Sequence, residues 1–196
     1  MGKTVECFFD VGSPYSFLGY KALPAIANAH GAEIAWRPML LGGVFKATGN
    51  HSPVEIPAKA RWTQTDMPLW AKSIGVRMKQ NPHFPINTLL LMRGAAGMQL
   101  KRPADFIRYL DVIFNAMWVE PRNLNDPDEV AATLAAGGFD PAEVLALAND
   151  PATKDHLKQT TEEAVARGVF GAPTFFVGSE MFWGQDRLHF VAEALA

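Results

Sequence analysis

The sequence has a single cysteine, Cys7, among 196 residues, so no disulfide can form within one chain. Thiol–disulfide exchange within one active site uses two cysteines two residues apart, and this class of oxidoreductase is therefore excluded. Cys7 lies in an apolar segment, and a free cysteine is commonly a buried and unreactive part of the core. We expect that position for it here.

A strong charge of either sign is also missing. The 18 basic and 20 acidic residues give a formal net charge of -2. Proteins that bind the phosphate backbone of nucleic acids carry a basic surface, so we expect no nucleic-acid partner. Apolar runs stay far below the roughly 20 residues of a membrane-spanning helix, and a strand-like segment begins at Thr4 without a preceding signal peptide. A cytoplasmic protein that does not cross a membrane is therefore predicted.

Several motifs that carry chemistry are missing too. Glycine-rich loops of nucleotide-binding sites and the Gly-x-Ser-x-Gly turn of serine hydrolases do not occur. The five histidines show no metal-ligand spacing; they are His30, His51, His83, His156 and His189. We expect no metal, no nucleotide and no serine hydrolase activity.

The first 38 residues show an α/β pattern. Residues 4–10 are typical of a buried strand, Ser13-Pro14 opens a helix that Gly31 stops, and residues 33–37 are typical of a second strand. A strand, a helix and a strand in this order predict a parallel β-α-β unit with a right-handed crossover.

The end of the chain returns to strands. Residues 173–177 and 180–183 are typical of a β-hairpin, and residues 185–195 of a closing helix. Between the two halves the pattern is helical, with candidate helices at residues 57–74, 88–101, 103–119, 128–136, 141–148 and 151–167. We therefore predict one domain over residues 1–196, with an all-helical insertion at about residues 43–168 between a β-α-β half and a β-β-α half.

Ser13 stands where a strand runs directly into a helix. Such a junction presents free backbone N–H groups and the positive end of a helix dipole, which stabilise a nearby anion such as a thiolate. The local pattern is also satisfied if Ser13 only caps the helix before Pro14, because serine is a preferred N-cap residue. Pro173 opens a strand, where a cis peptide bond is tolerated, although an isolated Ala-Pro bond is usually trans.

Taken together, these segments make the sequence similar to a known family. It resembles the kappa-class glutathione transferases and their bacterial relatives, the 2-hydroxychromene-2-carboxylate isomerases, which have a thioredoxin-like fold of the disulfide-oxidoreductase-A type. The resemblance covers essentially the whole chain and is carried by residues 9–16 (FDVGSPYS), 37–45 (RPMLLGGVF), 48–50 (TGN), 83–85 (HFP), 168–173 (GVFGAP) and 182–187 (FWGQDR).

The resemblance implies a site for reduced glutathione. In that family the serine matching Ser13 hydrogen-bonds the glutathione sulfur. The other implied contacts are Asn50, Lys59, Ala172 before a cis-Pro173, and Gln185 and Asp186 at the γ-glutamyl end. From the residues alone, the favoured interpretation of Lys59 is a solvated lysine on a helix face, whereas Gln185 and Asp186 are equally well explained as ordinary capping residues of a first helical turn.

The resemblance also implies an activity. We expect an isomerase that converts 2-hydroxychromene-2-carboxylate, a small aromatic carboxylate, into trans-o-hydroxybenzylidenepyruvate. Alternatives are a glutathione transferase that conjugates electrophiles, and a glutathione-binding protein without turnover. Family members are commonly dimers, so a homodimer is expected. Candidate pocket residues, assigned from chain position, are Tyr15, Phe17, Phe45, Trp62, Phe84 and Trp183.

Overall fold

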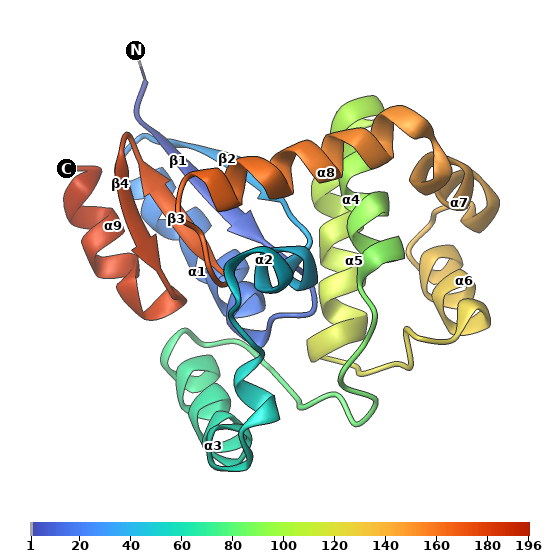
Figure 1. Cartoon of the computed structure of the whole chain (residues 1–196), viewed down its shortest axis with the longest axis horizontal. Coiled ribbons are helices and arrows are strands. Elements are labelled where there is room, and N and C mark those ends of the chain that lie inside the picture. The colour runs from blue at the N-terminus through green and yellow to red at the C-terminus, as the bar shows by residue number, and fades with distance from the viewer. Residues whose placement is uncertain (1) are drawn as a thin grey trace.

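The computed structural model describes residues 2–196. It contains a four-stranded mixed sheet with helices on both faces and a block of helices at one end (Figure 1). The strands lie in the order β2-β1-β3-β4; β1 and β2 are parallel, and the other neighbours are antiparallel. Their bounds are β1 (Thr4–Phe9), β2 (Glu33–Pro38), β3 (Thr174–Val177) and β4 (Glu180–Trp183).

The helices between β2 and β3 form the insertion. The predicted thioredoxin-like α/β fold with a helical insertion is thereby confirmed. The α-helices are α1 (Pro14–Ala29), α2 (Leu41–Thr48), α3 (Pro57–Ser73), α4 (Leu89–Lys101), α5 (Phe106–Trp118), α6 (Pro127–Ala136), α7 (Pro141–Asn149), α8 (Pro151–Ala166) and α9 (Leu188–Ala194). Short 3₁₀ turns are η1 (Pro53–Glu55), η2 (Pro103–Asp105) and η3 (Gln185–Arg187).

Three details differ from the expectation. Helix α2 was not among the candidate helices, because Gly42 and Gly43 near its start lower helix propensity. The segments predicted as single helices over residues 103–119 and 185–195 each begin with a 3₁₀ turn, a common form of a helix terminus.

Strand β1 is buried on both faces, as a central strand requires. Cys7 and Phe9 point into the larger core cluster, with residues of α1, α4 and α5, whereas Phe8 lies in a smaller cluster with residues of α2 and α8. Cys7 is 1% exposed, which confirms its predicted place in the core, and burial raises the pKa of its thiol.

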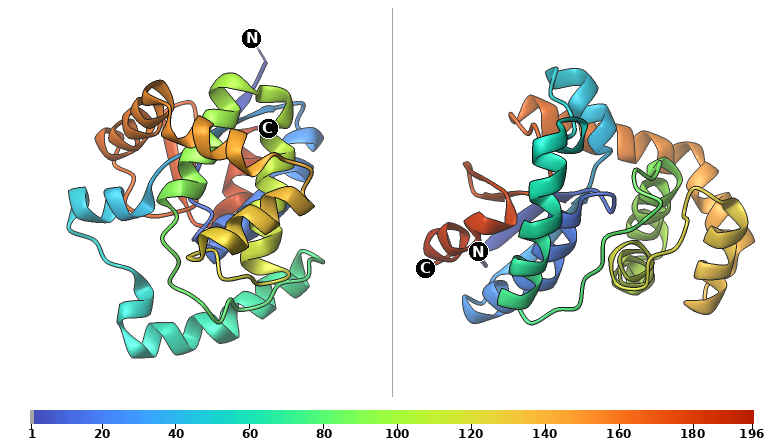
Figure 2. Two further views of the ribbon diagram at one scale, coloured as in Figure 1. Left: turned by 90° about the vertical axis from the view of Figure 1, so that its right-hand side faces the viewer. Right: turned by 90° about the horizontal axis from the view of Figure 1, so that it is seen from below.

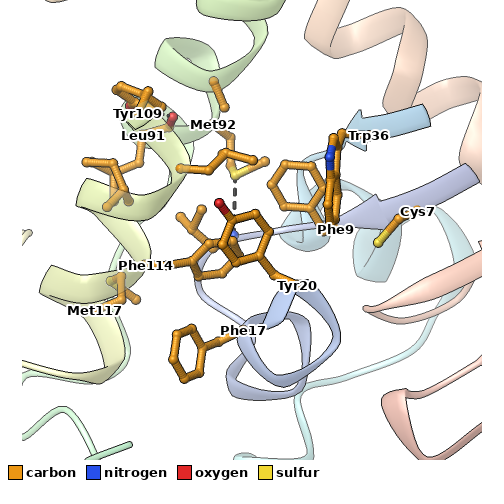
Figure 3. Close-up of a cluster of buried hydrophobic side chains, with 14 of the residues drawn as sticks. Cys7, Phe9, Phe17, Tyr20, Trp36, Leu91, Met92, Tyr109, Phe114 and Met117 are labelled. Carbon is orange, nitrogen blue, oxygen red and sulfur yellow. Dashed lines mark hydrogen bonds between the residues drawn. The ribbon is translucent and has the colours of Figure 1, made fainter. Parts of the chain in front are cut away.

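An aromatic cluster joins the sheet half to the helical insertion (Figure 3). The ring of Phe114 on α5 stacks on Tyr20 of α1 with a centroid distance of 4.9 Å, and it lies 5.9 Å from Phe17. Full burial of one such aromatic side chain stabilises a fold by about 1.5–3 kcal/mol. The ion pair of Lys21 with Asp111 between the same helices is partly exposed, and such pairs contribute about 0–1 kcal/mol. Apolar burial therefore holds the two parts together.

Helix α3 lies apart from the helical block and packs beside α1 (Figures 1 and 2). Few of its side chains are buried, and Trp62 and Leu69 are more than half exposed. Within residues 2–196 no single helix has the length and hydropathy to span a membrane. Helices α6 and α7 meet these two criteria only when they are counted together, and the pair is bent by 117°.

Candidate active site

The junction between β1 and α1 places the hydroxyl of Ser13 at the amino end of the helix. Ser13 is the N-cap residue, and its Oγ accepts a hydrogen bond of 3.1 Å from the N–H of Ser16. The same Oγ donates to the carbonyl oxygen of Ala172 at 2.9 Å. Ser13 is only 5% exposed. It therefore caps α1, as expected, and it also reaches a segment 159 residues away in the chain.

The segment that receives this hydroxyl contains a cis peptide bond between Ala172 and Pro173, as the resemblance implies. The carbonyl oxygen of Pro173 accepts a bond of 2.9 Å from the N–H of Gly184 at the end of β4. A Cβ on Gly171 would lie 2.5 Å from Nε1 of Trp183, so glycine is needed for the indole to pack there. These contacts hold Ala172 beside Ser13.

Two backbone N–H groups at this junction differ from their neighbours in their hydrogen bonding. Within residues 2–196, the N–H groups of Tyr15 and Ala172 make no hydrogen bond. The amino end of a helix carries a partial positive charge of about half an electron, and the first turn of α1 contains no acidic residue. The free donors and the positive helix end together favour an anionic group at this place.

The hydroxyl of Ser16 has a different environment from that of Ser13. Its Oγ is buried and has no hydrogen-bond partner among the described residues. A buried, unpaired hydroxyl costs about 1–3 kcal/mol relative to one in water. The serine pair thus consists of one hydroxyl with two hydrogen bonds and one with none.

Asn50 contacts the loop that contains Ala172, whereas Lys59 makes no such contact among the described residues. The Nδ2 group of Asn50 donates to the carbonyl oxygen of Phe170 at 2.8 Å, two residues before Ala172. Lys59 is exposed on α3, and within residues 2–196 its ammonium group makes no ion pair or hydrogen bond. Its proposed contact with glutathione remains a prediction.

Two carboxylates lie near the phenol of Tyr15. The phenol donates to Oδ2 of Asp66 on α3 at 2.9 Å. Burial, this hydrogen bond and the charge of Asp186 raise the pKa of Tyr15 to about 12, so the phenol stays protonated at neutral pH. Asp66 was missed from the sequence because it lies 51 residues from Tyr15, on a helix without a recognisable motif.

Gln185 and Asp186 lie at the start of the last helical segment. Gln185 is 8% exposed, and both residues line a mostly apolar cavity of about 220 Å³ together with Leu18 of α1 and Trp70 of α3. Gly184, which precedes them, has φ of 100°, a conformation that favours glycine. This turn directs the acid of Asp186 toward the α1–α3 side, where Tyr15 lies.

The aromatic residues predicted for the pocket have unlike positions. Phe17 is 1% exposed and belongs to the core, so we do not include it in the proposed pocket. Phe84 precedes a second cis proline, which was not expected, and packs on a core tryptophan. Trp183 packs on Phe170, and Trp62 is 60% exposed on α3. Tyr15 and Phe45 are partly buried.

Asp10 is a buried residue of this region that was missed from the sequence. It is 1% exposed, and its carboxylate accepts hydrogen bonds of 2.9 Å from Gly12, 2.9 Å from Leu41 and 3.0 Å from the hydroxyl of Thr88. Burial raises the pKa of Asp10, while the three hydrogen bonds oppose the shift by favouring the charged form. Two of its partners are 31 and 78 residues away, so no local pattern reveals it.

The fold is thioredoxin-like, and serines stand at positions 13 and 16 where β1 runs into α1. Residues 4–196 match the DSBA-like thioredoxin domain family, and the chain belongs to this family. Within the described residues no three His, Cys, Asp or Glu side chains lie close enough to hold a metal ion.

Relatives within the family carry two kinds of name. The chain is 30% identical to 2-hydroxychromene-2-carboxylate isomerase of Pseudomonas putida over 97% of this chain and 93% of that protein. It is 28% identical to the protein of the same name from Sphingobium xenophagum, over 100% and 99%. It is also 28% identical to glutathione S-transferase kappa 1 of Homo sapiens, over 98% and 91%. These matches confirm the resemblance seen in the sequence.

A solved structure extends the similarity to three dimensions. The structure of a 2-hydroxychromene-2-carboxylate isomerase matches with a TM-score of 0.85 and 28% identity, over 98% of this chain and 94% of that chain.

Proposed function

We propose that the protein is a glutathione-dependent isomerase that converts 2-hydroxychromene-2-carboxylate into trans-o-hydroxybenzylidenepyruvate. One observation carries the proposal: the hydroxyl of Ser13 lies at the amino end of α1, 2.9 Å from the carbonyl oxygen of Ala172, where a helix end favours a bound thiolate. Cys7, the only cysteine, is buried in the core, so the thiol comes from a bound molecule.

The groups around Ser13 fit glutathione. The unpaired N–H of Ala172 and its carbonyl oxygen suit the backbone of a cysteinyl residue, which pairs with extended chain as a strand does. The carboxylates of Asp66 and Asp186 suit the ammonium group of the γ-glutamyl end. The side-chain amide of Asn50, which is held beside Phe170, suits a polar contact with the tripeptide.

Glutathione, when bound, supplies a nucleophilic thiolate that adds reversibly to the conjugated double bond of the opened substrate, lets that bond rotate and leaves unchanged. Ser13 donates a hydrogen bond that favours the thiolate over the thiol, and the positive end of α1 acts in the same direction. To do so, its hydroxyl hydrogen turns away from Ala172, which frees that carbonyl oxygen to accept from the ligand.

Isomerase activity is favoured by the relatives in Pseudomonas putida and Sphingobium xenophagum. The second candidate is conjugation of electrophiles to glutathione, favoured by the similarity to the human kappa transferase. Both use the same sulfur site and differ in whether glutathione is consumed. A homodimer, a cytoplasmic location and a role in aromatic catabolism remain predictions.

The test mixes the purified protein with 2-hydroxychromene-2-carboxylate, with and without reduced glutathione, and follows substrate absorbance and free thiol together. We expect conversion that requires glutathione and leaves the thiol concentration unchanged. Ser13→Ala should slow the reaction about 10²–10³-fold, the usual cost of removing a preorganised hydrogen-bond donor to a charged centre. Ser179→Ala, in the exposed turn between β3 and β4, is the matched control and should keep full activity.

Three other results would change the assignment. Loss of thiol in proportion to product would indicate a transferase. Binding of glutathione without turnover of this substrate or of an electrophile such as 1-chloro-2,4-dinitrobenzene would indicate a binding protein. Absence of glutathione binding by calorimetry would refute the proposed function.

A further inference from the structure

The buried carboxylate of Asp10 has no role in the proposed chemistry, although it lies three residues before Ser13. All three of its hydrogen-bond partners are donors. No ion pair among the described residues involves it, so its polar partners are these three donors. A carboxylate in this environment is costly to bury, and its hydrogen bonds decide whether it is tolerated.

Its two oxygens connect different segments. Oδ1 accepts from Gly12, in the loop that carries Ser13, and the carbonyl oxygen of Asp10 accepts from the N–H of Ser13 itself at 3.0 Å. Oδ2 accepts from Leu41, the first residue of α2, and from Thr88, which precedes α4. Asp10 therefore holds the start of α2 directly against the Ser13 loop.

The other end of α2 also reaches the site. The helix ends at Thr48, Gly49 follows with φ of 71°, and Asn50 then donates to Phe170 at 2.8 Å. Phe170 and Ala172 belong to the loop that receives the Ser13 hydroxyl. This loop is therefore contacted by two side chains, Ser13 and Asn50. Asn50 follows the end of α2, and the first residue of α2 is bound by Asp10.

We propose that Asp10 is a positioning residue that sets the placement of Asn50 relative to Ser13 by holding the first residue of α2. This inference rests on the proposed function, because glutathione is the ligand expected to lie between these two side chains. Asp10 does not touch the ligand; it acts through α2.

The isosteric variant Asp10→Asn tests the requirement for two acceptor oxygens. An amide has one oxygen, so its NH₂ group must face one of the backbone donors, Gly12 or Leu41. The orientation with nitrogen toward Leu41 is the favoured one, because the hydroxyl of Thr88 can rotate and accept from it. Asp10→Asn should therefore keep the Gly12 bond and lose the Leu41 bond.

The experiment compares Asp10→Asn with Tyr109→Phe. The control removes a buried hydrogen bond of 2.8 Å, from the Tyr109 hydroxyl to the carbonyl oxygen of Leu91, within the helical insertion. In the ligand-free proteins, NMR follows hydrogen exchange of the Leu41 N–H and the signal of the Asn50 side-chain amide. Calorimetry then measures the dissociation constant of glutathione.

For Asp10→Asn we expect exchange at Leu41 to be at least tenfold faster, a shifted Asn50 amide signal and a dissociation constant at least tenfold higher. Tyr109→Phe should change none of the three. The proposal would be overturned if exchange at Leu41 became faster while the Asn50 signal and the glutathione affinity stayed unchanged. Asp10 would then have a structural role only. If the wild-type protein binds no glutathione, the proposed function fails, and the Asn50 signal alone decides whether Asp10 positions this side chain.

Discussion

Helix α1 and helix α7 begin with the same sequence pattern, a capping residue followed by proline, but the two caps differ. Asp140 caps α7 with an exposed carboxylate that accepts from Ala142 at 2.8 Å. Ser13 caps α1 with a buried, neutral hydroxyl that also donates to Ala172. A carboxylate cap compensates the positive end of its helix, whereas a neutral cap leaves that end free for an external anion. The neutral cap of α1 is therefore compatible with the anion that the proposed function places there.

Ser13→Asp should have the largest effect, because it gives α1 the kind of cap that α7 has. Two like charges about 4 Å apart repel by about 4 kcal/mol at an effective dielectric constant of 20, which corresponds to about 10³-fold weaker binding of a thiolate. Calorimetry with glutathione measures this loss, and thermal unfolding checks that the variant is folded. Asp140→Ser, the reverse exchange, should bind glutathione as the wild type does. Affinity of Ser13→Asp within tenfold of wild type would contradict the distinction between the two caps.

Asp140→Ala tests the structural cap. Loss of an aspartate N-cap destabilises a protein by about 0.5–2 kcal/mol, so the free energy of unfolding in urea should fall by about 1 kcal/mol. Glutathione affinity should not change, because Asp140 caps a helix of the insertion. A drop in affinity without a drop in stability would show that the α7 cap is coupled to the site.

Asp150, the cap of α8, adds a pH dependence that the neutral cap of α1 lacks. Its hydrogen bond with Lys101 holds the pKa of the Asp150 carboxyl below its usual range. A lowered pKa in the folded state stabilises the protein above the unfolded carboxyl pKa of about 3.9, and the contribution disappears as pH falls through the folded pKa. The Tm difference between wild type and Asp150→Asn should therefore be largest near pH 6 and shrink toward pH 3. When Lys101→Met is present in both proteins, the Tm difference should depend less on pH. If the Tm difference between wild type and Asp150→Asn were the same at every pH, the effect assigned to Lys101 would be contradicted.

Ser16→Ala should have the smallest effect. The variant keeps the backbone N–H of residue 16, which donates a hydrogen bond to the Ser13 hydroxyl. It removes only a buried hydroxyl that has no partner among the described residues. Stability should stay the same or rise by up to about 1 kcal/mol, and glutathione affinity should be unchanged. A clear loss of affinity would show that this hydroxyl acquires a partner when the ligand binds.

Regular patterns explain the parts of the fold that could be predicted. Apolar residues in strands and proline after a capping residue located β1, β2, the final hairpin and most helices of the insertion to within a few residues. Helix α2 was missed because its two glycines lower local propensity, and its first N–H is held by Asp10 from outside the helix. Asp66 was missed for a similar reason: its partner Tyr15 is distant in the chain.

The sequence by itself excluded one class of chemistry and located most helix starts. Serines at positions 13 and 16 and one cysteine in an apolar strand exclude a disulfide exchanger, and capping residues mark where helices begin. Tertiary structure decided which hydroxyl has partners, which carboxylate is buried and which segments meet. Ser13 and Ala172, or Asp10 and Thr88, become neighbours only when the sheet and the insertion pack together, since local sequence constrains backbone geometry over a few residues and contact across the fold depends on burial.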